Sequence, residues 1–166
     1  MSAAATTPAL RPLLPADIPV LAAIFTAAIE ELTGDDYSSD QQEAWLSVAD
    51  DEEAFGKKLA GGLTLIATLR NAPVGFASLE GKDHIDMLYV HPSAAGQGVA
   101  SSLCDALEKL AGGRGAKSLT VNASDNAQEF FKKRGYVAKQ RNSVTINGEW
   151  LANTTMLKTL ESGGQA

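Results

Sequence analysis

Residues 95–101 place two glycines and three other small residues between an apolar run and a segment with helical periodicity; the stretch is AGQGVAS. The first N–H groups of a helix have no partner within the helix, and with the positive end of the helix dipole they attract anions. Glycine lets a phosphate approach the backbone without a Cβ atom in the way, and Ser101 can add a hydroxyl. The sequence therefore predicts a phosphate or pyrophosphate site here, with an ordinary tight turn as the alternative.

Two familiar phosphate motifs do not fit this loop. A P-loop needs a lysine and a hydroxyl residue after its second glycine, whereas Val99 and Ala100 follow Gly98. A dinucleotide fingerprint needs a third glycine where Ser101 stands, and an acidic residue at the end of the next strand, which here ends at Ala123 without one. The ligand is therefore expected to be a different phosphate compound.

Titratable side chains lie directly before the loop, in the run HIDMLYV. The two-residue period of a strand predicts that His84, Asp86, Leu88 and Val90 share one face. A carboxylate and an imidazole on that face could exchange protons with a bound ligand. Asp86 could equally be a structural hydrogen-bond acceptor, and His84 could be an exposed residue at the start of the strand.

The other reactive residue types are scarce. Cys104 is the single cysteine, which excludes an intramolecular disulfide, fits a reducing compartment and is expected to be a buried apolar residue. Only His84 and His91 are present, so no zinc-binding spacing can be built and no metal is expected.

The pattern of apolar residues and turn signals predicts the elements that position these residues. Strands are expected at 9–14, 63–70, 73–80, 84–90, 117–123, 136–146 and 149–160. Helices are expected at 15–32, 39–48, 51–62, 99–113 and 125–135. The Asn147-Gly148 pair predicts a hairpin between the last two strands. The order β-α-α-α-β-β-β-α-β-α-β-β indicates a mixed α/β fold.

Length and charge limit the possible classes of protein. The chain has 166 residues and a net charge of -6, which favours one domain over 1–166 and argues against nonspecific nucleic-acid binding. The ends, 1–7 and 161–166, are expected to be disordered tails. No run is long and apolar enough for a membrane span, and the N-terminus lacks the basic region of a secretory signal. A cytoplasmic protein is expected.

Two blocks resemble the GNAT superfamily of N-acetyltransferases. Strand LYV followed by PSAAGQGVAS is similar to the acetyl-CoA loop of that family, with Ala95 where glutamine or arginine is usual. VNASDNAQEFFKKRGY resembles a second family block, with Phe131 where tyrosine is usual. HIDMLYV, the stretch YSSDQQEAW and the terminal hairpin further resemble the YafP-like branch.

The resemblance implies a central twisted mixed sheet that is splayed at strands 4 and 5, is flanked by helices and binds acetyl-CoA as co-substrate. Backbone groups of Leu88, Tyr89 and Val90 would pair with the pantetheine arm. The amides of Ala95, Gly96, Gln97, Gly98, Val99, Ala100 and Ser101 would bind the pyrophosphate. Asn122 could hydrogen-bond the pantetheine amides, or instead close its strand. Asn126, Phe130 and Phe131 lie where the family contacts the far side of the cofactor.

The resemblance also implies a set of catalytic roles. A lysine-like amine with a pKa near 10.4 is mostly protonated at pH 7, so a general base is expected, with Asp86 as first candidate and His84 as second. Backbone N–H groups near Leu88 would polarise the thioester carbonyl. Because Phe131 has no proton for the departing thiolate, Tyr136, Tyr89 or water substitutes, or the thiolate leaves unaided.

The acceptor is expected to be a primary amine of a small molecule or a peptide. Tyr37 and Trp45 would wall the acceptor site, although Trp45 could be a buried anchor. Two other functions stay open: a catalytically silent acyl-CoA-binding sensor module and a mononucleotide-binding regulator. No nucleic acid or membrane partner is expected, and the chain is expected to be a monomer or a homodimer.

Overall fold

The computed structural model describes residues 7–160, so the predicted tails lie outside the described residues apart from Thr7. The strands are β1 (Ala9–Pro12), β2 (Leu63–Leu69), β3 (Ala72–Glu80), β4 (His84–Val90), β5 (Ser118–Ser124), β6 (Val137–Ile146) and β7 (Glu149–Thr159). The helices are α1 (Ile18–Leu32), α2 (Ser39–Leu46), α3 (Glu52–Ala60), α4 (Val99–Gly113) and α5 (Gln128–Lys133). Their order along the chain is the predicted one.

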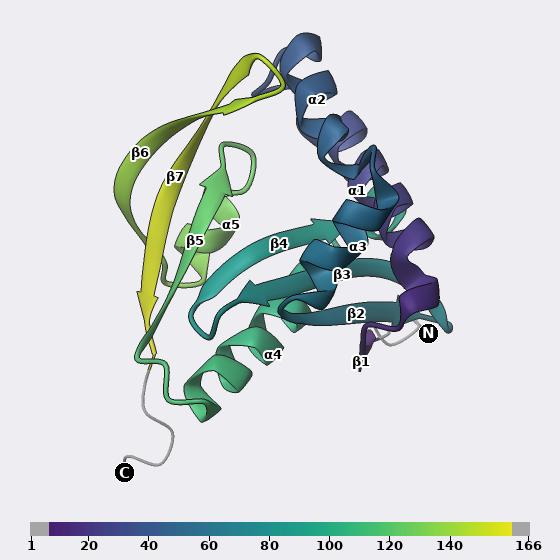
Figure 1. Ribbon diagram of the computed structural model, residues 1–166. Coiled ribbons are helices and arrows are strands. Elements are labelled where there is room, and N and C mark those ends of the chain that lie inside the picture. Colours follow the sequence, from purple (N-terminus) through teal and green to yellow (C-terminus); the bar gives the residue numbers. More distant parts are fainter. Residues whose placement is uncertain (1–6, 161–166) are drawn as a thin grey trace, which may run out of the picture.

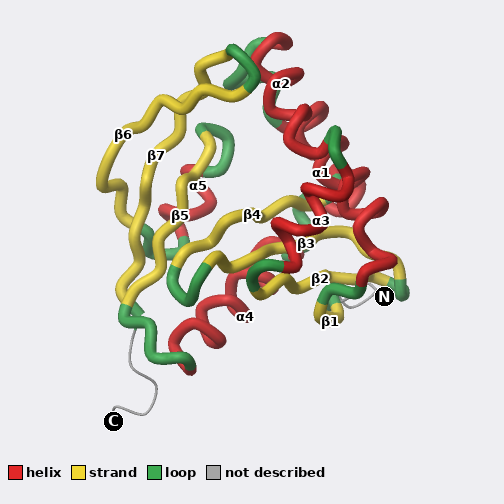
Figure 2. Tube along the Cα trace, viewed as in Figure 1, coloured by secondary structure: helices red, strands yellow, loops and turns green. Residues whose placement is uncertain are grey.

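The strands form one mixed sheet in the order β1-β2-β3-β4-β5-β7-β6 (Figures 1 and 2). β1 to β4 are antiparallel neighbours, β4 and β5 are parallel, and β7 pairs antiparallel with both β5 and β6. A parallel pair requires a crossover, and α4 provides it between β4 and β5. The predicted mixed α/β fold is confirmed.

Helices cover both faces of the sheet and bury two apolar cores. On one face Leu21 and Phe25 of α1 pack with Phe55 of α3. On the other face α4 and α5 bury Leu103, Leu107 and Phe131. In α4 the buried positions recur every three or four residues, as an amphipathic helix requires. The sheet is therefore the middle layer of three.

Several element boundaries lie one to three residues from the predicted ones. β1 ends at Pro12, because Pro15–Asp17 already form a short 3-10 turn into α1. Arg70 and Asn71 have positive φ angles of 53° and 67°, so the β2–β3 turn lies earlier than predicted. α5 is shorter than predicted and begins at Gln128. The predicted hairpin turn is confirmed, with positive φ at both Asn147 and Gly148.

None of the helices within residues 7–160 combines the length and the apolar character needed to cross a membrane.

Candidate functional site between β4 and β5

Strands β4 and β5 are paired over only two residues, His84 with Thr120 and Ile85 with Val121. Beyond this point β5 keeps its full antiparallel pairing with β7, from Ser118 to Ser124, and diverges from β4 (Figure 2). The splay predicted at the fourth and fifth strands is therefore present.

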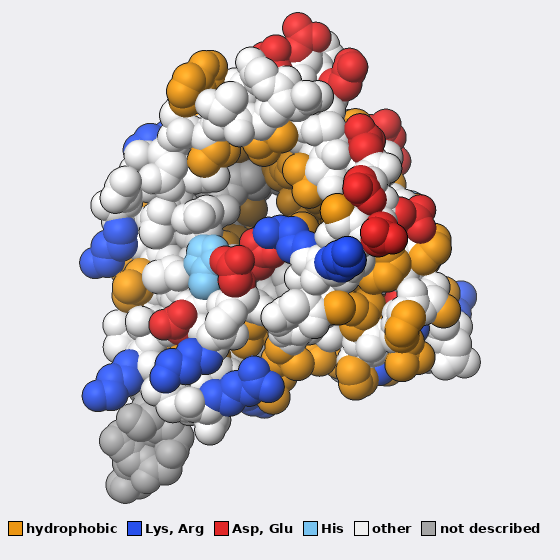
Figure 3. All heavy atoms as spheres, in the orientation of Figure 1, with side chains coloured by type: hydrophobic (Ala, Val, Ile, Leu, Met, Phe, Trp, Pro, Cys, Tyr) orange, Lys and Arg blue, Asp and Glu red, His pale blue; other side chains and the backbone are white. Residues whose placement is uncertain are grey.

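A cavity of about 130 Å³ lies at this divergence. Its walls come from both faces of the sheet: α1 and α2 on one side, α5 and the segment before it on the other. In Figure 3 the molecule is hollowed between the β6–β7 hairpin and helices α1 and α2. We call this cavity the cleft; its lining includes Ala28, Leu32, Trp45, Asp86, Leu88, Tyr89, Val90, Asn122, Asn126 and Phe131.

The backbone of β4 alternates between its two neighbours. His91 donates its N–H to the Val74 carbonyl at 2.8 Å, so residues an even number of positions before His91 also face β3. Leu88 and Val90 therefore direct their N–H and C=O groups toward the cleft, where β5 has diverged. Tyr89 faces β3 instead, so its predicted backbone pairing with a ligand is corrected.

A β-bulge interrupts β4 at Asp86. Ser78 of β3 pairs with Met87 and Leu79 pairs with Ile85, which leaves Asp86 without a partner. Ile85 belongs to the core under α4, whereas Met87 belongs to the core under α1, although the two are two residues apart. The prediction that Asp86 shares a face with Leu88 and Val90 is therefore wrong, because the extra residue breaks the two-residue period.

The bulge turns Asp86 toward α3. Its carboxylate lies 3.4 Å from the ammonium of Lys58, and its side chain is one-fifth exposed. Asp86 lines the cleft, as a general base would have to. His84 lies lower, where the strands are still paired; its Nδ1 is 2.8 Å from Thr120 Oγ1, and it is not among the cleft-lining residues. The structure thus brings Asp86, but not His84, to the cleft.

The loop after β4 has the conformation that an anion site needs. Gly96 and Gly98 have φ of +79° and +80°, and Gly98 caps α4 with no side chain bonded to the helix terminus. Among the described residues, the amides of Gly96, Gly98, Val99, Ala100 and Ser101 have no acceptor; the first bonded amide of α4 is that of Ser102, to Gly98 O at 3.0 Å.

Two predicted phosphate contacts in this loop are corrected. The amide of Ala95 donates to Pro92 O at 3.1 Å, and that of Gln97 donates to Ala94 O at 3.3 Å. Both amides therefore stabilise the turn and are not available to a phosphate. The remaining five free amides, at the positive end of a 15-residue helix, still fit a pyrophosphate.

Asn122 on β5 is oriented by a chain of hydrogen bonds across the hairpin. Its Oδ1 accepts from Thr155 Oγ1 at 2.7 Å, and Thr155 Oγ1 accepts from Asn142 Nδ2 at 2.8 Å. Because its oxygen is occupied, Asn122 can offer its amide N–H groups to a ligand in the cleft. Thr155 and Asn142 were not predicted from the sequence, although the hairpin turn at Asn147-Gly148 sets their register.

The α5 side of the cleft is apolar. Phe131 is 2% exposed and packs edge-on against Phe130 and Tyr136, with ring centroids 5.1 Å apart in each pair. Asn126 also lines the cleft. Tyr136 does not; its hydroxyl donates to Glu108 Oε2 at 3.0 Å on α4, and burial raises its pKa. Tyr136 is therefore removed as the candidate acid, because its proton is committed to Glu108.

On the α1 and α2 side, only one of the two aromatic residues predicted to contact the acceptor, Trp45 and Tyr37, lines the cleft. Trp45 lines the cleft and donates its Nε1–H to the Tyr89 hydroxyl at 3.2 Å. Burial raises the pKa of Tyr89, so this hydroxyl keeps its proton at neutral pH. Tyr37 is 6% exposed; its hydroxyl donates to Ala152 O at 2.6 Å and accepts from Asp125 N at 2.9 Å. Tyr37 is thus an anchor between α2 and the hairpin, which corrects the prediction that it contacts substrate.

The other chemical groups lie outside the cleft. Cys104 is buried, and burial raises the pKa of its thiol to about 12, so it is not a nucleophile at neutral pH. Residues 7–160 contain no group of three or more His, Cys, Asp or Glu side chains that could hold a metal ion.

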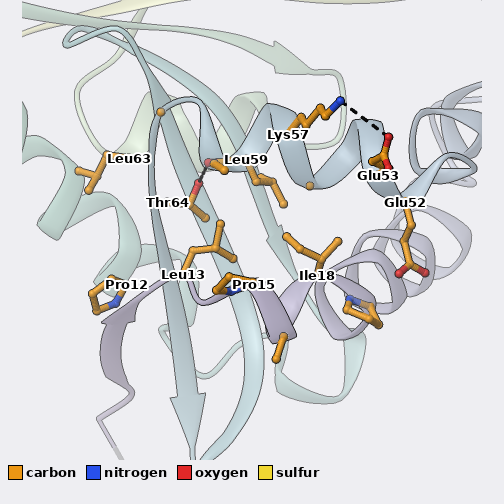
Figure 4. A pocket seen from close by; sticks show the side chains of 15 residues that line it. Pro12, Leu13, Pro15, Ile18, Glu52, Glu53, Lys57, Leu59, Leu63 and Thr64 are labelled. Atoms are coloured by element: carbon orange, nitrogen blue, oxygen red, sulfur yellow. Dashed lines mark hydrogen bonds and ion pairs between the residues drawn. The ribbon is translucent and has the colours of Figure 1, made fainter.

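A larger cavity, of about 790 Å³, lies between α3, the start of α1 and strands β1 and β2 (Figure 4). Its lining is mainly apolar, including Leu13, Ile18 and Leu59, with the Lys57–Glu53 ion pair beside it. None of the predicted site residues lines it, so its size does not make it the reaction site.

Comparisons with known proteins agree with the geometry. The model of the acetyltransferase (GNAT) domain family matches residues 33–160. The chain is 35% identical over 142 residues to the uncharacterized N-acetyltransferase YafP of Escherichia coli K12, covering 86% of this chain and 89% of that one. It is 33% identical over 90 residues to the peptidyl-lysine N-acetyltransferase YjaB of Salmonella typhimurium, covering 52% of this chain and 58% of that one.

Solved structures are similar as well. A crystal structure of a GCN5-related N-acetyltransferase from Rhodopseudomonas palustris is 69% identical, with a TM-score of 0.93 over 96% of this chain and all of that one. The PaiA N-acetyltransferase of Thermoplasma acidophilum, solved with coenzyme A, shares the fold at 16% identity, with a TM-score of 0.76 over 92% of this chain and 99% of that one.

Proposed function

The chain belongs to the GNAT family of acetyltransferases, with acetyl-CoA as its co-substrate, and on this premise we propose that it acetylates a primary amine of a small molecule or a peptide. The amine attacks the acetyl group directly while both substrates are bound. The observation that carries the proposal is the row of five free amides at the start of α4, next to a strand whose Leu88 and Val90 backbone groups face an open cleft.

Bound acetyl-CoA supplies an activated carbonyl group, and residues of the chain hold that group in place. The free amides from Gly96 to Ser101 would hold the pyrophosphate. The backbone groups of Leu88 and Val90 would pair with the pantetheine arm, and the Leu88 N–H would stabilise negative charge on the carbonyl oxygen. Asn122, oriented by Thr155, would bind a pantetheine carbonyl.

The acceptor amine must lose a proton before it attacks. At pH 7 roughly one lysine-like amine in a few thousand is neutral, so a carboxylate that takes the proton raises the reactive fraction. Asp86 is the acidic side chain that lines the cleft and is our proposed general base. The departing thiolate can take a proton from the Tyr89 hydroxyl, which lines the same cleft, or leave unaided.

The acceptor itself is proposed from the shape of the cleft. Trp45 and Tyr89 form one aromatic wall, with Asp86 nearby, which suits an amine carried on an apolar chain. A lysine side chain has this character, and the relative YjaB acts on peptidyl lysine by its name. The buried thiol of Cys104 fits a reducing compartment such as the cytoplasm, and a monomer or a homodimer stays our expectation.

The test combines binding with turnover. Acetyl-CoA at about 100 times its Kd should raise the melting temperature by about 5–10 °C. With a panel of amines the wild type should release free CoA, and Asp86→Asn should lower kcat by about 10²–10⁴-fold while the thermal shift persists.

A second function is favoured by one observation, the buried Phe131 in place of a hydroxyl-bearing side chain. In that case the chain is a silent acyl-CoA sensor, and the wild type would bind acetyl-CoA without turning over any amine. A shift with ATP or GTP but none with acetyl-CoA would contradict both functions.

A further inference from the structure

A small polar cavity of about 190 Å³ lies on the far side of Asp86 from the cleft. It is bounded by the end of α3, the start of β2, and β3; its lining is Lys57, Lys58, Gly61, Gly62, Ser78, Leu79, Glu80 and Asp86. Among residues 7–160, Asp86 alone lines both this side cavity and the cleft. The Asp86 carboxylate thus lies between the side cavity and the cleft.

The side cavity contains a buried polar group that lacks a partner. Ser78 is 3% exposed, and its Oγ has no hydrogen-bond partner among the described residues. Leaving a buried hydroxyl unpaired costs free energy, and native proteins usually satisfy such groups with protein or with ordered water. The cavity is large enough for water and is lined by charged side chains, so it meets both conditions for hydration.

The reaction needs a route for a proton at this position. At neutral pH the acceptor is an ammonium ion, R–NH₃⁺, and the products are R–NH–CO–CH₃, CoA–SH and one proton. The amine nitrogen loses two protons when the N–C bond forms and the C–S bond breaks. One of them balances the thiol, and the other must reach solvent. Ala127 and Phe131, on the α5 side of the cleft, carry no group that could accept this proton.

We propose that the side cavity holds water bound by Ser78 Oγ and the Asp86 carboxylate, and that this water carries the released proton from Asp86 to solvent. Lys58, 3.4 Å from Asp86, holds the carboxylate in position at the boundary between the two cavities. Lys57 and Glu80 are the other charged residues that line the side cavity, and Tyr89 lines the cleft together with Asp86. This inference rests on the proposed function, with Asp86 as the base.

The first test is a charge variant with a matched control. Lys58→Met should lower kcat on the order of tenfold, because the carboxylate is then no longer held at the boundary between the two cavities. The KM for acetyl-CoA should stay unchanged, and Lys58→Arg should restore kcat. Lys57→Met is the control, since Lys57 lines the same cavity but pairs with Glu53. A wild-type kcat in Lys58→Met, or an equal effect in Lys57→Met, would overturn the inference.

The second test does not depend on turnover. A crystal structure of the free protein should show an ordered water within hydrogen-bond distance of both Ser78 Oγ and Asp86. Ser78→Ala should remove that water without raising the melting temperature, whereas loss of a truly unpaired hydroxyl would raise it. A dry cavity, or a stabilised Ser78→Ala variant, would contradict the inference. If the wild type turns over no amine, the proposed function fails, while this water test still decides the hydration of the cavity.

Discussion

Gly98 lies at the start of α4 with φ of +80°, and open space surrounds the position where its Cβ would be. Gly98→Glu therefore places bulk and a negative charge among the free amides, and we expect acetyl-CoA affinity to fall at least about a hundredfold, which is near 2.7 kcal/mol. Calorimetric titration measures this loss.

Gly115→Glu is the matched control for that substitution. Gly115 has φ of +91° and equally open surroundings, but it follows the opposite end of α4. Both variants carry the same new charge and a similar cost of about 1 kcal/mol for a positive φ. Equal affinity in the two variants would contradict the placement of the pyrophosphate.

For single residues, the sequence predicts a role best where that role depends on residues close together in the chain. The free amides at 96–101 follow from glycines and a helix start within one short segment, so they could be predicted. Tyr37 and Tyr136 could not, because their hydroxyl partners, Ala152 and Glu108, lie 115 and 28 residues away and only the packed fold brings them together.

At the scale of elements, an ion pair joins β1 to the turn before α1. The Arg11 guanidinium makes two hydrogen bonds of 2.8 Å to the Asp17 carboxylate, which also accepts from Leu14 N at 2.8 Å. These hydrogen bonds hold the pKa of Asp17 below its usual value. A carboxylate of this kind stabilises the fold above the pKa it has when unfolded.

Asp17→Asn should therefore lower the free energy of unfolding by about 1–2 kcal/mol at pH 7. The difference should disappear as the pH falls below about 3.9 and through the lower folded-state pKa, where Asp17 itself is protonated. Urea titrations at several pH values measure it, with exposed Asp50→Asn as the control. A difference that persists at low pH would mean that the contact depends on shape and not on charge.

The order of elements could be predicted because each has its own periodicity and turn residues. The face of Asp86 could not, because a bulge is a property of two paired strands: the irregular step is seen only when β4 is aligned with Ser78 and Leu79 of β3.

Across the whole molecule, acidic and basic side chains are concentrated on different helices. Ten of the 20 acidic residues lie between Ile18 and Gly62, where the basic residues are Lys57 and Lys58 alone. In Figure 3 acidic side chains gather along α1 to α3, while basic ones gather near α4 and the start of β5. Helices α1 and α2 also line the cleft, so under the proposed function a cationic acceptor would approach through a negative field.

We therefore expect kcat/KM for a diamine to fall more steeply with added salt than kcat/KM for a monoamine of equal length, since screening weakens the attraction of the larger charge more. Initial rates between about 20 and 500 mM salt measure the two slopes; at 0.1 M the screening length is about 10 Å. Equal slopes would show that the acidic layer does not guide the acceptor.

The bulge in β4 has a consequence for how such enzymes diverge. Because the backbone, and not the side chain, turns position 86 toward α3 at the edge of the cleft, any residue substituted there is presented at the same place. Point mutations at position 86 can therefore change the chemistry of the site while the fold is kept. Deletion of one residue from β4 would instead shift the alternation of side chains on one side of the bulge, so that those facing one helical layer would face the other. Descendants of this gene should therefore vary in residue type at position 86, and the length of β4 should hardly ever change.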